Sequence, residues 1–295
     1  MSSEAKSISF ISASGGVGKT TLSIYLAKWL IESRHSLSTR LLLIDLDPTA
    51  GLSLSLMSEE EYQERVDKRI TLSDLFFWDY KKGLGKRANE YSRPIKHGGH
   101  ELNIIVPGEE LDLVAAELWR YGTPGPDFRK ALQNTGIFKL YDYVIFDSAP
   151  FFDIRYTVLS LFSASKHVIV LRPSPVDFRR TARMLKRIME YANAFNLETH
   201  EFLRKFIVVF NLARQQTRET DTLIDLGFRG ISRGRTGKSE EHENFKEYVS
   251  ELKRLIKVSE WLIPTKAELA RLELDRGTKE VLKGVLGDLV DHLRS

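Results

Sequence analysis

Cysteine is absent from the 295 residues of the chain. Its absence excludes disulfides, thiolate catalysis and metal sites with cysteine ligands, and with them metallochaperones and reductases that depend on cysteine. No apolar run approaches the roughly 18 residues of a membrane span, and the first ten residues lack the basic and apolar segments of a secretory signal. The charge excess is small, since 44 Lys and Arg residues face 40 Asp and Glu residues. An excess of this size permits contact with nucleic acid but does not demonstrate it.

Short apolar runs alternate with helical periodicities along the chain. The expected strands cover residues 7–12, 41–45, 102–106, 143–147, 167–171, 206–210 and 261–263. Amphipathic helices are expected over 22–30, 111–119, 178–192 and 245–256. This alternation predicts an α/β fold, doubly wound, with a mostly parallel sheet of about seven strands and helices on both faces.

No linker rich in proline, glycine or serine divides the chain, so we expect a single domain over residues 1–295. Three stretches are polar or irregular. We expect a solvated helix over 57–69, a surface loop over 81–100 and an Arg- and Gly-rich polar segment over 228–244.

A glycine-rich segment lies between the first expected strand and the first expected helix. Residues 13–21 have the sequence ASGGVGKTT, which matches a phosphate loop except that Ala13 stands at its first glycine position. The backbone N–H groups and the helix N-terminus would bind phosphate, Lys19 would reach the β- and γ-phosphates, and the Thr20 hydroxyl would coordinate Mg²⁺. The alternative is a glycine-rich turn before a helix. The residues expected to contact nucleotide are Gly15, Gly16, Val17, Gly18, Lys19, Thr20 and Thr21.

Three aspartates follow apolar runs. Asp45 and Asp47 come at the end of the expected strand 41–45, and Asp147 ends the strand 143–147. Ligands of open α/β sheets bind beyond the carboxyl ends of the strands, so we expect these acids to converge on the phosphate loop. The alternative is that they only cap the helices that follow.

Seven segments in order resemble the ParA/MinD family of deviant Walker A ATPases. The phosphate loop is one of them, and LLLIDLDPTAGLS (41–53) resembles the switch I segment, with Thr49 and Ala50 in place of Gln and Gly. YDYVIFDSAP (141–150) resembles switch II. The other four are TLSDLF (71–76), LNIIVPGEELDLVAAELW (102–119), FIVVFNLAR (206–214) and WLIPTKAELARLELDRGT (261–278).

The resemblance implies a Mg²⁺-dependent protein that binds ATP and ADP and hydrolyses ATP. It assigns the attacking water to Asp47 with support from Asp45, places Mg²⁺ on Thr20 with Asp147 in its outer shell, and makes Lys19 the phosphate-binding cation. Asn211, Pro264 and Thr265 would line the base pocket. The resemblance further implies an ATP-dependent homodimer, a ParB-like centromere-binding partner protein and a location in the cytoplasm at the nucleoid.

Ser14 is the main departure from the family pattern. The family carries its signature lysine at this position, where it reaches across a dimer to the phosphates of the partner. A serine is neutral and too short for this, so we expect slow hydrolysis unless another cation substitutes. Arg155 in the switch II segment, or an arginine from a partner protein, are the candidates.

Two basic clusters are candidates for binding nonspecific DNA. Neutralised phosphates give affinity without sequence readout, and the alternative is a solvated helix face and a polar loop. The candidates are Arg179, Arg180, Arg183, Lys186 and Arg187 on the helix 178–192, and Arg229, Arg233, Arg235 and Lys238 in the glycine-rich stretch.

The last helical pattern carries an apolar stripe from Leu282 to Leu293. Its charges are balanced, so we expect it to pack on the sheet rather than on a membrane surface, and we expect no stable membrane insertion. Three functions remain open. They are a DNA-partitioning ATPase, a MinD-like positioning ATPase, and a nucleotide-dependent regulator that hydrolyses little ATP.

Overall fold

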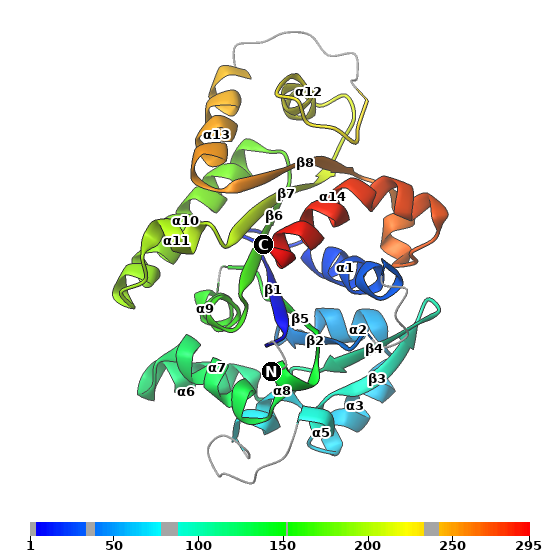
Figure 1. Ribbon diagram of the computed structural model, residues 1–295, viewed down its shortest axis with the longest axis vertical. Helices are drawn as coiled ribbons and strands as arrows, with labels where there is room; N and C mark the ends of the chain where they lie inside the picture. The colour runs from blue at the N-terminus through cyan, green and yellow to red at the C-terminus, as the bar shows by residue number, and fades with distance from the viewer. Residues whose placement is uncertain (1–3, 34–38, 78–87, 152, 233–241) are drawn as a thin grey trace. The chain divides into compact units, whose positions relative to one another are not determined.

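The computed structural model describes residues 4–33, 39–77, 88–151, 153–232 and 242–295, and these form two structural units. Unit 1 comprises Met1–Ile11 and Leu22–Lys166, and unit 2 comprises Ser12–Thr21 and His167–Ser295. Figure 1 labels their elements. The single domain over 1–295 stays a prediction.

Five strands of unit 1 lie in the order β3-β4-β2-β5-β1. Their bounds are β1 (Lys6–Ile11), β2 (Leu41–Leu46), β3 (Arg93–His97), β4 (His100–Ile105) and β5 (Tyr143–Ser148). The pairs β1–β5, β5–β2 and β2–β4 are parallel. Every residue of β2 and β5 is buried. Strands of a parallel sheet are covered on both faces, which is why both segments are apolar almost throughout.

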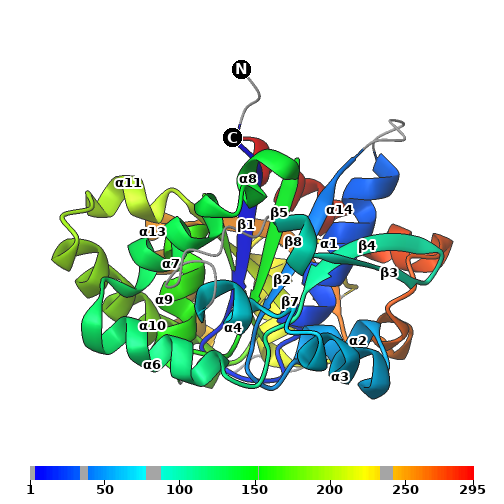
Figure 2. The same ribbon diagram turned by 90° about the horizontal axis from the view of Figure 1, so that it is seen from below.

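The prediction of a surface loop over 81–100 is wrong for residues 88–97, which the structure describes. Residues 88–91 form helix α5 and residues 93–97 form strand β3, which pairs antiparallel with β4. Figure 2 shows this hairpin at the edge of unit 1. β3 escapes prediction because Ile95 is its only buried residue. The hairpin signal is Gly98-Gly99, whose φ angles of 54° and 77° suit a tight turn between twisted strands.

Helices of unit 1 lie on both faces of its strands, with α6, α7 and α9 on one face and α1 on the other (Figure 1). Their bounds are α1 (Lys19–Ser33), α2 (Gly51–Leu56), α3 (Glu59–Asp67), α4 (Leu72–Asp74), α5 (Ala88–Tyr91), α6 (Leu111–Tyr121), α7 (Pro124–Asn134), α8 (Ile137–Leu140) and α9 (Ile154–Ser163). The solvated helix expected over 57–69 is confirmed by α3, which begins with a capping box between Ser58 and Glu61.

Three strands of unit 2 lie in the order β6-β7-β8 and pair in parallel. The elements of this unit are β6 (Lys166–Leu171), α10 (Pro175–Ala194), α11 (Thr199–Leu203), β7 (Phe206–Ala213), α12 (Arg218–Asp225), α13 (His242–Leu255), β8 (Lys257–Pro264), the 3₁₀ helix η2 (Ala267–Arg271) and α14 (Arg276–Arg294). Phe178 of α10 packs on Phe210 of β7 and on Phe245 of α13, with ring centroids 5.5 Å and 4.9 Å apart. These rings join α10 and α13 to one face of the strands.

Helix α14 packs on the opposite face of β7 and β8, as Figure 1 shows. The residues of its stripe from Leu282 to Leu293 are buried, which confirms the expected packing on the sheet. Close approach is possible because Gly284 faces the indole ring of Trp261 without a side chain between them. Within the described ranges, no helix combines the length and apolar character that crossing a membrane requires.

The predicted α/β class with mostly parallel strands and helices on both faces is confirmed. The described residues contain eight strands, and β3 is the one that the sequence did not predict. The four helices expected from periodicity correspond to α1, α6, α10 and α13.

A pair of glycine substitutions in α14 tests its packing on β8. Gly284→Ala should lower the free energy of unfolding by ~1–3 kcal/mol, because the added Cβ overlaps the Trp261 ring. Gly287→Ala is the matched control, since nothing lies within 4 Å of its Cβ position, and should raise stability by up to ~1 kcal/mol. Urea unfolding followed by circular dichroism measures both, and equal effects would contradict this packing.

Candidate functional site

The glycine-rich loop has the conformation of a phosphate loop. β1 ends at Ile11 and α1 begins at Lys19, so the loop lies between a buried strand and a helix N-terminus. Gly16 and Gly18 have φ angles of 66° and 88°, which side chains other than glycine rarely adopt. The N-terminus of α1 adds the positive end of the helix dipole. This arrangement can bind a phosphate group.

Two hydrogen bonds hold the loop, one from β7 and one within the loop itself. The Asn211 amide nitrogen in β7 donates to the Val17 carbonyl at 2.8 Å, and the Ser12 hydroxyl donates to the Ser14 carbonyl at 2.6 Å. A Cβ on Gly18 would overlap the Asn211 amide, so glycine is required there for packing as well as for conformation. Asn211 is therefore placed against the loop backbone, and its predicted contact with a base stays a prediction.

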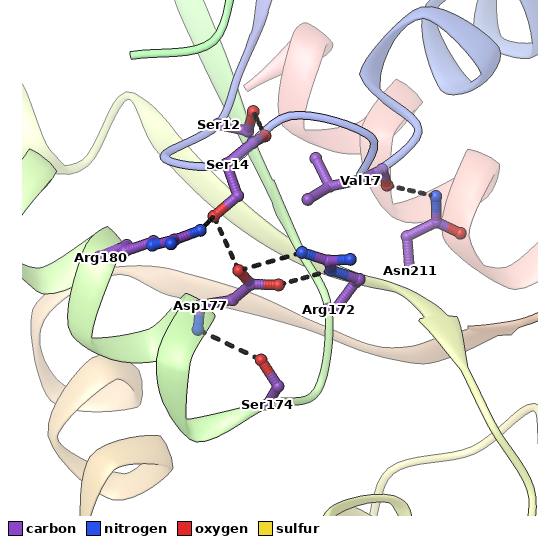
Figure 3. Close-up of polar contacts among 8 residues, drawn as sticks. All are labelled: Ser12, Ser14, Val17, Arg172, Ser174, Asp177, Arg180 and Asn211. Atoms are coloured by element: carbon purple, nitrogen blue, oxygen red, sulfur yellow. Dashed lines mark hydrogen bonds and ion pairs between the residues drawn. The ribbon is translucent and has the colours of Figure 1, made fainter. Parts of the chain in front are cut away.

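Ser14 takes part in a polar network with the start of α10, drawn in Figure 3. Its hydroxyl donates to Asp177 Oδ1 at 2.7 Å, and Arg172 Nε donates to Asp177 Oδ2 at the same distance. The Arg180 guanidinium reaches the Ser14 hydroxyl oxygen at 3.3 Å. Burial would raise the pKa of Asp177, but the hydrogen bonds from Arg172 and Ser14 outweigh it and hold that pKa below its ordinary value. Asp177 is therefore a charged group whose contacts bring Ser14 and Arg172 together.

Asp177 and Arg172 were missed by the sequence analysis. A signal was present, because Ser174 and Pro175 followed by an acid at position 177 are typical of a helix N-terminus. Ser174 is the N-cap of α10 and its hydroxyl accepts from the Asp177 N–H at 3.2 Å. What the signal does not show is that the carboxylate faces the phosphate loop.

A cleft of about 600 Å³ adjoins the loop in unit 2. Its volume is within the range of small-molecule sites. The charged residues of its lining are Arg172, which is paired with Asp177, Arg214 and Glu219. The lining residues are Gly16, Arg172, Pro173, Ser174, Leu212, Arg214, Thr217, Glu219 and Thr265.

The cleft includes one of the residues predicted to line a base pocket. Thr265 follows β8, and its N–H donates to the Ala213 carbonyl at 2.9 Å. Pro264, the last residue of β8, is half-buried and is not among the residues that line the cleft. The structure thus brings Thr265 and Gly16 to one cavity.

Asp45 and Asp147 face each other in unit 1, on the neighbouring strands β2 and β5. Asp45 accepts hydrogen bonds from the Asp47 N–H at 3.0 Å and from the N–H and hydroxyl of Ser53 at 2.9 Å and 2.8 Å. Burial, followed by the negative charge of Asp147, raises the pKa of Asp45 to about 7 despite these bonds. Because Ser53 lies in the first turn of α2, the capping alternative describes part of what Asp45 does.

Asp47 follows the last residue of β2 and shapes the turn into α2. Its Oδ1 accepts from the N–H and the hydroxyl of Thr49 at 2.9 Å and 2.7 Å. Ala50 then adopts a left-handed conformation with φ 55°, at the position where the resemblance implies glycine. Asp45, Asp47 and Asp147 belong to unit 1 and the phosphate loop to unit 2, so their convergence stays a prediction.

Basic side chains lie along the outer face of α10. The exposed ones are Arg179, Arg180, Arg183, Lys186 and Arg187. Arg229 is also exposed, 3.9 Å from the Glu260 carboxylate and with its guanidinium carbon 5.9 Å from the centre of the Trp261 ring. Arg233, Arg235 and Lys238 lie outside the described residues.

Arg155, the intrachain candidate for a substitute cation, is held by a neighbour. Its Nε and Nη2 donate to the Asp153 carboxylate at 2.6–3.1 Å. Asp153 caps the helix α9 that Arg155 enters. The charge of Arg155 is therefore compensated within unit 1.

Comparison with known families and structures finds a family match over part of the chain and a similar fold over nearly all of it. A family model described as an AAA domain matches residues 5–200. A McdA variant from Cyanothece in complex with ATP superposes with a TM-score of 0.65 at 16% identity, covering 99% of this chain and 97% of that one. ParA of pNOB8 bound to nonspecific DNA gives a TM-score of 0.58 at 16% identity, with 98% and 97% covered. A plasmid partition protein from Borrelia burgdorferi gives 0.61 at 15% identity, with 98% and 100% covered.

Curated relatives are similar in sequence over part of their length. A Sinorhizobium fredii protein named as a replication protein A is 25% identical over 209 residues, which is 66% of this chain and 48% of the relative. A Mycobacterium tuberculosis protein described as uncharacterized is 28% identical over 152 residues, 50% of this chain and 40% of its own. The chain thus spans about half or less of the length of the curated relatives it matches.

The raised pKa of Asp45 predicts a stability that falls as pH rises. Its ordinary value is 3.8 and its folded value about 7, so between these pH values the folded chain holds the proton that the unfolded chain releases. The free energy of unfolding should fall across this window by on the order of 4 kcal/mol in buffer without Mg²⁺. Urea unfolding at several pH values measures the slope, which Asp45→Asn should flatten. Asp112→Asn, at an exposed position, should keep the slope, and an unchanged slope in Asp45→Asn would contradict the assignment.

Proposed function

The chain belongs to the AAA domain family, as a P-loop protein of the ParA/MinD kind, and on this premise we propose that it is an ATPase. In this proposal it binds ATP and ADP with Mg²⁺ and hydrolyses ATP slowly in DNA partition. The single observation that carries the proposal is the phosphate loop. Left-handed Gly16 and Gly18, with Lys19 and Thr20 opening α1, form a cradle for the phosphates of a nucleotide. The cleft beside Gly16 has room for the remainder of the nucleotide.

Mg²⁺ fits the oxygen donors that the chain offers. A Thr20 hydroxyl and an Asp147 carboxylate are hard ligands, the kind that Mg²⁺ takes together with nucleotide phosphates and water. When bound, the ion would neutralise charge on the β- and γ-phosphates. Lys19 binds the same phosphates, Asp47 orients the attacking water, and Asp45 supports it in this proposal.

Nonspecific DNA is the proposed macromolecular ligand, bound by the basic face of α10. Arg179, Arg183 and Arg187 are exposed at intervals of four residues on one helix face, which suits a row of phosphates. One similar structure, the pNOB8 ParA, holds nonspecific DNA. Arg229 and the undescribed Arg233, Arg235 and Lys238 extend the proposed surface.

Several further properties belong to the same proposal. They are a homodimer that forms with ATP, a ParB-like partner that binds the centromere, a location at the nucleoid in the cytoplasm, and one functional domain over residues 1–295. A MinD-like membrane role has less support because the apolar stripe of α14 is buried against β7 and β8.

A nucleotide-dependent regulator with little hydrolysis is the second candidate. The observation that favours it is the neutral side chain at position 14, whose hydroxyl is bonded to Asp177. The two candidates differ in single-turnover hydrolysis, which a partition ATPase performs measurably and a regulator of this kind scarcely performs.

Lys19→Ala tests nucleotide binding. Charge-assisted hydrogen bonds contribute ~1.5–3 kcal/mol each, so the affinity for ATP with Mg²⁺ should fall about 10- to 100-fold. Isothermal titration calorimetry measures this affinity, with Lys283→Ala at an exposed position of α14 as the control that keeps full affinity. Equal affinity in the folded Lys19→Ala protein would refute the site.

Charge reversal on α10 tests the DNA surface. Arg183→Glu with Arg187→Glu should weaken binding of unrelated duplexes alike and reduce the slope of log affinity against log salt by about 2, since about one phosphate contact is lost per arginine. Fluorescence anisotropy over a salt series, with ATP present, measures the slope. Arg276→Glu with Lys283→Glu changes the net charge equally on α14 and should leave the slope unchanged. Equal losses in both double variants would point to net charge rather than to α10.

A further inference from the structure

The start of the phosphate loop has one positive charge more than its neighbours compensate. Arg172 and Arg180 both reach the pair formed by Ser14 and Asp177, and Asp177 is the carboxylate of this group (Figure 3). One negative charge therefore faces two guanidinium groups. Which arginine it neutralises decides where the surplus charge lies.

Asp177 forms its ion pair with Arg172. Arg172 Nε lies 2.7 Å from Oδ2 and Nη2 lies 3.4 Å from Oδ1, while the Ser14 hydroxyl takes the other short bond at 2.7 Å. The Asp177 side chain is only 2% exposed. Mutual stabilisation raises the pKa of Arg172 and lowers that of Asp177. Both oxygens of this buried carboxylate therefore have hydrogen-bond partners, and its charge is balanced by Arg172.

Arg180 holds the surplus charge. Among the described residues, no carboxylate lies within ion-pair distance of it, and its hydrogen bond is the one to the Ser14 hydroxyl. It stands on the first turns of α10, and its exposed guanidinium approaches the loop on the side opposite Asn211 (Figure 3). Ser14 can accept from Arg180 because its own proton points to Asp177. Ser14 thus has a neutral side chain, but its hydroxyl binds the cationic side chain of Arg180.

We infer that Arg180 supplies the positive charge that stabilises the phosphoryl group during ATP hydrolysis, and that Ser14 positions it. The inference rests on the proposed ATPase function. In that reaction the water oxygen bonds to the γ-phosphorus, the β–γ bridging P–O bond breaks with its electron pair passing to ADP, and the water protons leave with phosphate and solvent. Arg180 keeps its proton throughout, because its part is electrostatic.

The test is single-turnover hydrolysis of ATP with Mg²⁺, together with ATP affinity from calorimetry, for the full chain and its variants. Arg180→Ala should slow turnover by about 100-fold while ATP affinity changes less than about threefold, because the charge acts mainly on the transition state. Arg180→Lys should recover part of the rate, and Ser14→Ala should lose less than Arg180→Ala. Arg254→Ala removes an equal charge from an exposed position of α13, and its turnover should equal that of the unchanged protein.

Each result has a distinct meaning. Turnover in folded Arg180→Ala equal to that of the unchanged protein overturns the inference, as does ATP binding with no hydrolysis above the Lys19→Ala background. Absence of ATP binding by the unchanged protein instead removes the proposed function. A loss in Arg180→Ala that appears only as weaker ATP binding also overturns it. Every copy in the assay carries the substitution, so the outcome is the same whether the guanidinium serves its own loop or that of a second copy.

Discussion

The candidate site depends on the hydrogen bonds and the ion pair of one buried carboxylate, that of Asp177. It joins Arg172 from the end of β6, Ser14 from the phosphate loop and, through its backbone, the N-cap Ser174 of α10. An ionised group is tolerated at this depth only because each of its oxygens receives a short hydrogen bond and a guanidinium balances its charge. The loop, the cleft and the basic helix are thus connected through one side chain.

The buried aspartates of unit 1 have surroundings that differ from those of Asp177. Asp45 and Asp147 are paired carboxylates on adjacent buried strands, and Asp45 accepts hydrogen bonds from the Asp47 N–H and from Ser53. Burial, followed by the negative charge of Asp147, raises the pKa of Asp45, so this carboxyl holds its proton more firmly than an exposed aspartate does. In the proposed function, a divalent cation near Asp147 would lessen the repulsion between the two carboxylates.

Apolar runs and helical periods are enough to predict the parallel strands and the long helices, because burial on both faces demands apolar residues nearly everywhere. β3 was not predicted since an edge strand with one buried residue has no such pattern, and only Gly98-Gly99 marked its hairpin. The phosphate loop was predicted because its conformation requires glycines at fixed places. Asp177 and Arg180 were not assigned to the loop because more than 160 residues separate them from Ser14, and neither spacing nor composition indicates which side chains a fold brings together.

The bond between Asn211 and the Val17 carbonyl has a consequence for the thermodynamics of ligand capture. A glycine-rich segment loses more conformational entropy on ordering than any other, and a loop that is ordered only by its ligand takes that loss out of the binding free energy. Here the Asn211 amide and the Ser12 hydroxyl order the loop during folding. The entropic penalty is therefore borne by the stability of the folded chain, and a phosphate group meets N–H donors that are already arranged.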